Sequence, residues 1–123
     1  MSALANVLVI EDDAEMREFL IRLLTRRNYS VTSAKNGKTG LASLTAQSFA
    51  LVITDIVMPD MEGLETIKRI RQINPDMPII AISGGGNDQM DYLKFAQRFG
   101  ANAVLAKPFD PAELLKVVAQ LVT

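Results

Sequence analysis

The sequence has no cysteine and no histidine among its 123 residues, and both absences exclude chemistry. Without cysteine, the chain can form neither a disulfide nor a thiolate metal site, and it has no thiol nucleophile. Without histidine, it lacks imidazole metal ligands, a Ser-His-Asp triad and a phosphohistidine of its own. Any metal site in this chain is therefore restricted to oxygen ligands.

Excess charge and long apolar runs are also missing. The formal net charge is −1, which argues against attraction to nucleic acid or to an anionic membrane. No basic N-terminal segment precedes a long apolar stretch, and no run approaches membrane-spanning length. We therefore expect a soluble cytoplasmic protein. A chain of this length can bury a sufficient core, so we expect residues 1–123 to form a single domain.

Apolar runs and helical periodicities alternate five times along the chain. Apolar segments predict strands at Asn6–Ile10, Phe49–Ile53, Pro78–Ile82 and Ala101–Ala106, and the alternating segment Ser30–Ala34 predicts a weaker, edge strand. Apolar residues spaced three or four apart predict a helix after each strand. Asp13 and Asp110 are placed to cap the first and last helices, and the fourth is expected between Asn87 and Gly100.

Strands that alternate with helices indicate an α/β fold with a parallel sheet covered on both faces. We expect a flavodoxin-like, doubly wound sheet of five strands in the order 2-1-3-4-5, flanked by five helices. In such sheets, ligands bind at the carboxyl ends of the strands, near the point where the strand order reverses.

Isolated polar residues stand at the ends of the predicted strands: Glu11 and Asp12, Asp55, Ser83, and Lys107. All strands of a parallel sheet point the same way, so these side chains should meet at one edge. Three carboxylates close together repel one another unless a cation is present, and oxygen ligands favour Mg²⁺. A carboxylate nucleophile, a divalent ion, an ammonium and a hydroxyl are the groups that phosphoryl transfer to aspartate needs.

Four segments carry a resemblance to a known family. They are VLVIEDD (7–13) with Arg17, DIVMP (55–59) with Gly63, ISG (82–84) and AKPF (106–109). With these segments in this order, one per strand end, the chain resembles the receiver domain of two-component response regulators, and the chemotaxis regulators in particular. The resemblance covers essentially the whole sequence.

The resemblance implies that Asp55 accepts a phosphoryl group from a partner histidine kinase or histidine phosphotransfer protein. It also implies that Mg²⁺ is bound by the side chains of Asp12 and Asp55 and by the Val57 carbonyl, with Glu11 acting through water. Lys107 would contact the phosphoryl group, and Ser83 would reorient toward it.

The same resemblance implies a regulatory role rather than an enzymatic one. The domain would assist its own phosphotransfer and dephosphorylation, and the surface of the fourth helix, fifth strand and fifth helix would signal to a downstream protein target or effector domain. We expect no direct contact with nucleic acid or membrane, and a monomer or weak dimer.

One departure from the family pattern leaves an alternative open. Receivers usually carry an aromatic residue three positions before the lysine, and here that residue is Val104. A β-branched side chain has few rotamers and no ring to move. A constitutive interaction module that keeps the receiver fold without using phosphorylation is therefore the alternative. A phosphatase acting through an aspartyl-phosphate is disfavoured, because Val57 stands where such enzymes place a second aspartate.

Overall fold

The computed structural model describes residues 5–56, 63–83, 94 and 97–122. Its centre is a parallel sheet of five strands in the order β2-β1-β3-β4-β5, as predicted. The strands are β1 (Asn6–Ile10), β2 (Ser30–Ala34), β3 (Leu51–Asp55), β4 (Ile79–Ser83) and β5 (Ala103–Ala106). The helices of the described part are α1 (Ala14–Thr25), α2 (Gly37–Ala46), α3 (Gly63–Ile73) and α5 (Pro111–Val122).

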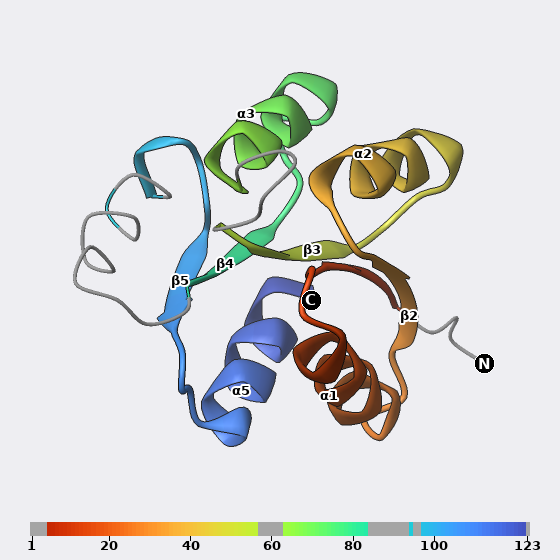
Figure 1. Cartoon of the computed structure of the whole chain (residues 1–123), viewed down its shortest axis with the longest axis vertical. Helices are drawn as coiled ribbons and strands as arrows, with labels where there is room; N and C mark the ends of the chain where they lie inside the picture. Colours follow the sequence, from red (N-terminus) through yellow and green to blue (C-terminus); the bar gives the residue numbers. More distant parts are fainter. Residues whose placement is uncertain (1–4, 57–62, 84–93, 95–96, 123) are drawn as a thin grey trace.

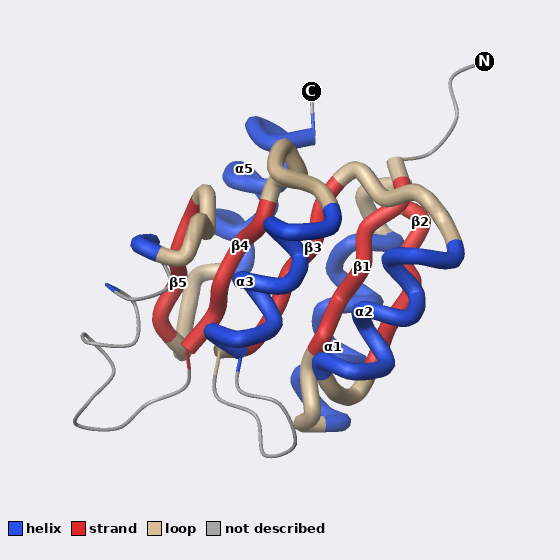
Figure 2. Tube along the Cα trace, turned by 90° about the horizontal axis from the view of Figure 1, so that it is seen from above, coloured by secondary structure: helices blue, strands red, loops and turns tan. Residues whose placement is uncertain are grey.

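The sheet separates two layers of helices. Helices α2 and α3 cover one face, and α1 and α5 cover the other (Figures 1 and 2). Successive side chains of β1 point to opposite faces, so Leu8 packs in the α2–α3 core and Val9 in the α1–α5 core, both fully buried. Because the central strands are buried on both sides, they are apolar along most of their length.

The observed strand β3 differs from the prediction and changes how the site is built. We predicted a strand at Phe49–Ile53, but pairing runs from Leu51 to Asp55, which lies opposite Ile82 of β4. The ladder continues past the apolar run because neighbouring backbones, not side-chain polarity, decide its length. Asp55 is therefore the last residue of a buried strand and not the first residue of a loop.

The last two strands also begin later than predicted, and β4 ends one residue later, whereas β5 ends at Ala106 as predicted. Pro78 was placed in β4, but it has no N–H to donate, and the strand runs instead from Ile79 to Ser83. Strand β5 begins at Ala103 rather than Ala101 and pairs Ala106 with Ser83. The shift in β4 brings Ser83, at the carboxyl edge, into the ladder.

The predicted helix caps are confirmed at both ends of the chain. The Asp13 carboxylate accepts a hydrogen bond from the Glu15 amide at 3.3 Å, and the Asp110 carboxylate accepts one from Ala112 at 2.9 Å. The predicted fourth helix lies mainly outside the described residues, and Gly100 at its end has a positive φ of 113°. No helix of the described part has the length and apolar character to cross a membrane.

An arginine ties together the loops at the amino edge of the sheet. The Arg71 guanidinium, at the end of α3, donates to the carbonyl of Gly100 at 2.6 Å and to that of Met77 at 2.5 Å. It also donates to the Asn102 side-chain oxygen at 2.8 Å, which accepts the Ile79 amide as well. This Arg71 network joins α3 to the segments that lead into β4 and β5, opposite the polar edge.

Candidate functional site

The carboxylates of the predicted site meet at the carboxyl edge of the sheet. Glu11 and Asp12 follow β1, and Asp55 ends the neighbouring strand β3, so the strand order alone brings them together. One oxygen from each of the three carboxylates lies within 4.8 Å of the others. Glu11 and Asp55 are buried, with 1% and 6% exposure, whereas Asp12 is exposed. The cluster therefore has two buried members and one that faces solvent.

Lys107 joins the two buried carboxylates. Its ammonium lies 2.7 Å from a Glu11 oxygen and 3.3 Å from an Asp55 oxygen. Its backbone amide donates to the Ser83 carbonyl at 2.7 Å, which extends the β4–β5 ladder to the lysine. The peptide bond between Lys107 and Pro108 is cis. The ammonium is thus held against the carboxylates from the end of a strand two positions away in the sheet.

The charges of this cluster do not balance. Burial raises the pKa of Glu11 to about 8 from an ordinary value of 4.5; the adjacent Asp55 raises it as well, while Lys107 lowers it. Burial alone would lower the pKa of Lys107, but its hydrogen bonds and charge interactions with Glu11 and Asp55 outweigh that effect and raise it. The Lys107 ammonium therefore stays charged, and the raised pKa of Glu11 indicates that Lys107 does not fully relieve the cost of burying this carboxylate beside Asp55.

The donor set fits a hard divalent cation. All of its groups are carboxylates, the ligands that Mg²⁺ prefers, and the exposed member gives access from solvent. A cation would also relieve the repulsion that raises the pKa of Glu11. The carboxylates of Glu11, Asp12 and Asp55 could together hold such an ion.

The comparison with known families agrees with this geometry. The sequence model described as "Response regulator receiver domain" matches residues 7–119. The chain belongs to the response regulator receiver family. Receiver domains are regulatory components of two-component systems, and this one presents the acidic pocket of the family at Glu11, Asp12 and Asp55.

Relatives of this receiver include proteins of very different length. It is 35% identical over 116 residues to the response regulator receiver protein CpdR of Brucella abortus, covering 94% of this chain and 95% of that protein. It is 42% identical over 118 residues to the DNA-binding transcriptional regulator NtrC of Azospirillum brasilense, covering 96% of this chain but only 24% of that protein. The chain spans about a quarter of the latter relative.

A solved structure shows the same fold. The CheY-like response regulator receiver domain protein from Methanospirillum hungatei superposes with a TM-score of 0.90 at 28% identity. The match covers 98% of this chain and 94% of that one. The similarity therefore extends over the sheet and both helical layers.

Three further residues singled out in the sequence, Ser83, Val57 and Val104, differ in what the structure shows of them. Ser83 is fully buried at the end of β4, beside the strand that carries Lys107. The Val57 carbonyl lies outside the described residues, so its predicted role as a metal ligand stays a prediction. Val104 lies in β5 and packs partly buried against the α2–α3 core. An aliphatic side chain thus occupies the position where the family usually has an aromatic ring.

Two residues beside Asp55 were not assigned roles from the sequence. The buried Thr54 hydroxyl donates to the Asp55 carbonyl at 3.0 Å, and the Gly63 amide donates to the Ile56 carbonyl at 3.0 Å. A Cβ on Gly63 would overlap the Ile56 backbone, so only glycine allows this close approach. The sequence pointed to Gly63 only as part of the segments that resemble the receiver family. It did not point to Thr54, because a β-branched residue is ordinary in a strand.

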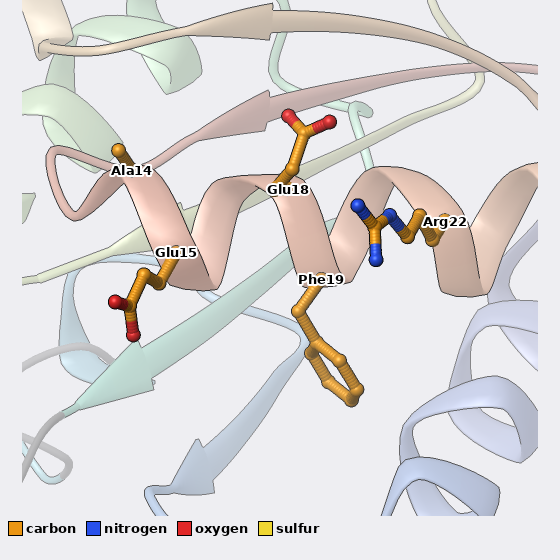
Figure 3. Close-up of a pocket in the computed structure, with 5 residues that line it drawn as sticks. All are labelled: Ala14, Glu15, Glu18, Phe19 and Arg22. Atoms are coloured by element: carbon orange, nitrogen blue, oxygen red, sulfur yellow. The ribbon is translucent and has the colours of Figure 1, made fainter.

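A surface hollow of about 380 Å³ lies on α1 and not at the carboxylate cluster. It is lined by Ala14, Glu15, Glu18, Phe19 and Arg22 (Figure 3). Phe19 is 40% exposed, and its ring lies 6.5 Å from that of Phe109, just after Lys107 in the chain. Figure 3 shows Glu15 and Phe19 pointing to one side of the helix and Glu18 to the other. This hollow contains no cluster of reacting groups.

Proposed function

We propose that this chain is a phosphoryl-accepting switch in a two-component or phosphorelay system, with residues 1–123 acting as one receiver domain. Asp55 receives the phosphoryl group from the phosphohistidine of a histidine kinase or a histidine phosphotransfer protein. The supporting observation is the Asp55 carboxylate itself. It is held at a strand end, 3.3 Å from the Lys107 ammonium and close to two further carboxylates.

The chemistry follows from the groups at the edge. An Asp55 oxygen attacks phosphorus; the new P–O bond forms as the P–N bond to the donor imidazole breaks, and the imidazole leaves with a proton. The Lys107 ammonium is placed to neutralise negative charge on the transferred group, and the Ser83 hydroxyl supplies a hydrogen bond from the next strand. These residues act by orientation and charge, which is how phosphoryl transfer is mostly catalysed.

In this proposal, Asp12 and Asp55 hold Mg²⁺ directly, Glu11 acts through water, and the Val57 carbonyl completes the protein ligands. When bound, Mg²⁺ neutralises charge on the phosphoryl oxygens as they transfer. The carboxylate cluster supports this role, because three carboxylates lie together and Lys107 does not bring the pKa of Glu11 back to its ordinary value.

The phosphoryl group would act on the rest of the molecule through Lys107. In the unphosphorylated state, the ammonium binds Glu11 and Asp55, and a phosphoryl oxygen on Asp55 would compete for it. Because Lys107 directly follows β5, its change of partner would alter the surface of the fourth helix, β5 and α5, and with it a downstream protein target or effector domain. With Val104 in β5, this coupling would operate without the aromatic ring usual in the family.

The proposal is tested by intact-mass spectrometry after incubation with a small phosphodonor and Mg²⁺. We expect a gain of about 80 Da, the mass of one phosphoryl group. Asp55→Asn should abolish the gain, whereas the exposed control Asp76→Asn should keep it. Hydroxylamine should remove the group, because it cleaves acyl phosphates and leaves phosphoserine intact.

The result that would overturn the proposal is the absence of any adduct with both a small donor and a phosphorylated kinase or phosphotransfer partner. That outcome would favour a constitutive interaction module. The two functions also differ in partner binding: the switch requires an affinity that changes with phosphodonor and Mg²⁺, and the module requires one that does not.

A further inference from the structure

Arg17 of α1 reaches back toward the carboxylate cluster without touching a carboxylate. Its guanidinium Nη1 donates to the Glu11 carbonyl at 2.9 Å and lies 3.5 Å from the Asp12 carbonyl. The side chain is partly buried. A hydrogen bond from a charged donor is stronger than one between neutral groups, so this contact is a firm restraint on the turn between β1 and α1.

The same turn carries two of the three carboxylates. The Glu11 amide is fixed by the Ala34 carbonyl at 3.0 Å, and the Glu11 side chain by Lys107. Asp12 differs, because its side chain is exposed and makes no hydrogen bond within the described part of the chain. The direction of the Asp12 carboxylate therefore depends on its backbone, which Arg17 contacts at the Asp12 carbonyl and which the Glu11 carboxylate also holds by accepting the Asp13 amide at 3.5 Å.

We propose that Arg17 is a positioning residue for the cation site, acting through the carbonyls of Glu11 and Asp12 to hold their carboxylates toward Asp55. This inference rests on the proposed function, since it gives the carboxylate cluster the task of binding Mg²⁺. A residue behind the ligands that fixes their orientation typically changes metal affinity by about 10- to 100-fold when it is removed.

Charge and position predict opposite effects at Arg17. A guanidinium near the site repels a cation, so removing its charge would by Coulomb's law tighten Mg²⁺ binding. Removing its hydrogen bonds would release the turn and weaken binding. A weaker affinity in a neutral variant can therefore come only from lost positioning.

The test is isothermal titration of Mg²⁺ into the full chain and four variants. Arg17→Ala and Arg17→Met remove the donor, and the second keeps an aliphatic stem in place of the arginine's. Arg17→Lys restores a charged donor. Arg22→Ala is the matched control, because it removes an exposed arginine from the same helix that donates to no carbonyl of the turn.

We expect the Mg²⁺ dissociation constant to rise about 10-fold in the Ala and Met variants. Arg17→Lys should return it to within about threefold of the original, and Arg22→Ala should leave it unchanged. In phosphorylation by a small donor, the half-saturating Mg²⁺ concentration should rise by the same factor in the Met variant. The rate at saturating Mg²⁺ should stay within about twofold, because a general loss of structure would lower that rate too.

Equal or tighter Mg²⁺ binding in a folded Ala or Met variant would overturn the inference. Circular dichroism melts in the absence of metal establish that the variant is folded at the titration temperature. If the unmodified chain accepts phosphoryl groups on Asp55 and the Arg17 variants bind Mg²⁺ normally, only the role of Arg17 is wrong. If the unmodified chain neither binds Mg²⁺ nor accepts a phosphoryl group, the proposed function and this inference are both wrong.

Discussion

Raising the pH should destabilise the metal-free protein in a range where most proteins titrate histidine. The responsible group is Glu11, whose pKa is raised by burial and by Asp55 to about 8 in the folded state, against 4.5 in the unfolded chain. Between these values the folded state binds the proton and the unfolded chain has released it. Stability from this group is therefore fully present below about pH 4.5 and is lost as pH rises toward about 8.

The size of this destabilisation follows from the single proton that Glu11 holds in the folded state. Where the folded state holds one proton more than the unfolded chain, the free energy of unfolding falls by about 1.4 kcal/mol per pH unit. Because Glu11 begins to ionise in the folded state as the pH approaches about 8, we expect less than this limit. A loss of about 2 kcal/mol from about pH 5.5 to 7.5 would lower Tm by about 6 to 10 °C.

Urea denaturation in a chelator, followed by circular dichroism across this pH range, measures the effect. The chain suits this assay because it has no histidine and no cysteine, so only the amino terminus ordinarily titrates in the range. Glu11→Gln should remove the pH dependence. Asp55→Asn should move its upper limit to lower pH, since burial of Glu11 remains while the neighbouring carboxylate is lost.

Two results would refute the reasoning on Glu11. One is a free energy of unfolding that stays constant between about pH 5.5 and 7.5. The other is a dependence on pH that persists unchanged in Glu11→Gln. Either result would mean that the buried carboxyl is ionised in the folded protein at ordinary pH.

Three further changes test other parts of the structure by urea denaturation in a chelator. Lys107→Met should lower the free energy of unfolding by about 2 kcal/mol, because it leaves two buried carboxyl groups without their cation. The exposed control Lys116→Met should change it by less than about 0.5 kcal/mol. Equal effects of the two substitutions would contradict the ion-pair geometry. Gly63→Ala should lower the free energy of unfolding by about 3 kcal/mol, because the alanine Cβ would overlap the backbone that follows β3. An unchanged free energy of unfolding would contradict that close approach. Arg71→Met should cost about 2 kcal/mol and speed amide exchange at the start of β5; unchanged exchange would show that the network does not hold this segment.

The sheet and the residues at its carboxyl edge could be predicted because both depend on residue type and order. Apolar or alternating segments mark the strands, and a polar residue at the end of a strand is fixed to one edge once all strands are parallel. Glu11, Asp55 and Lys107 could therefore be brought together before any distance was known. The exact strand ends could not, because backbone pairing continued through Asp55 and Ser83 after the apolar run had stopped.

The arginines show what residue type does not reveal. Arg17 and Arg71 both donate to backbone carbonyls, and every residue has a carbonyl, so no partner can be recognised in the sequence. Their roles depend on the path of a loop around the guanidinium. Arg17 belonged to the family resemblance, yet its contact with the turn became visible only when that path was known.

The Arg71 network and the carboxylate cluster lie at different edges of the sheet. At the amino edge, the neutral acceptors of Arg71 fasten α3, β4 and β5 together. At the carboxyl edge, like charges oppose one another and the balance depends on what is bound there. The Arg71 contacts and the carboxylate cluster thus lie at opposite edges of the sheet, so a substitution within the cluster leaves every partner of Arg71 in place.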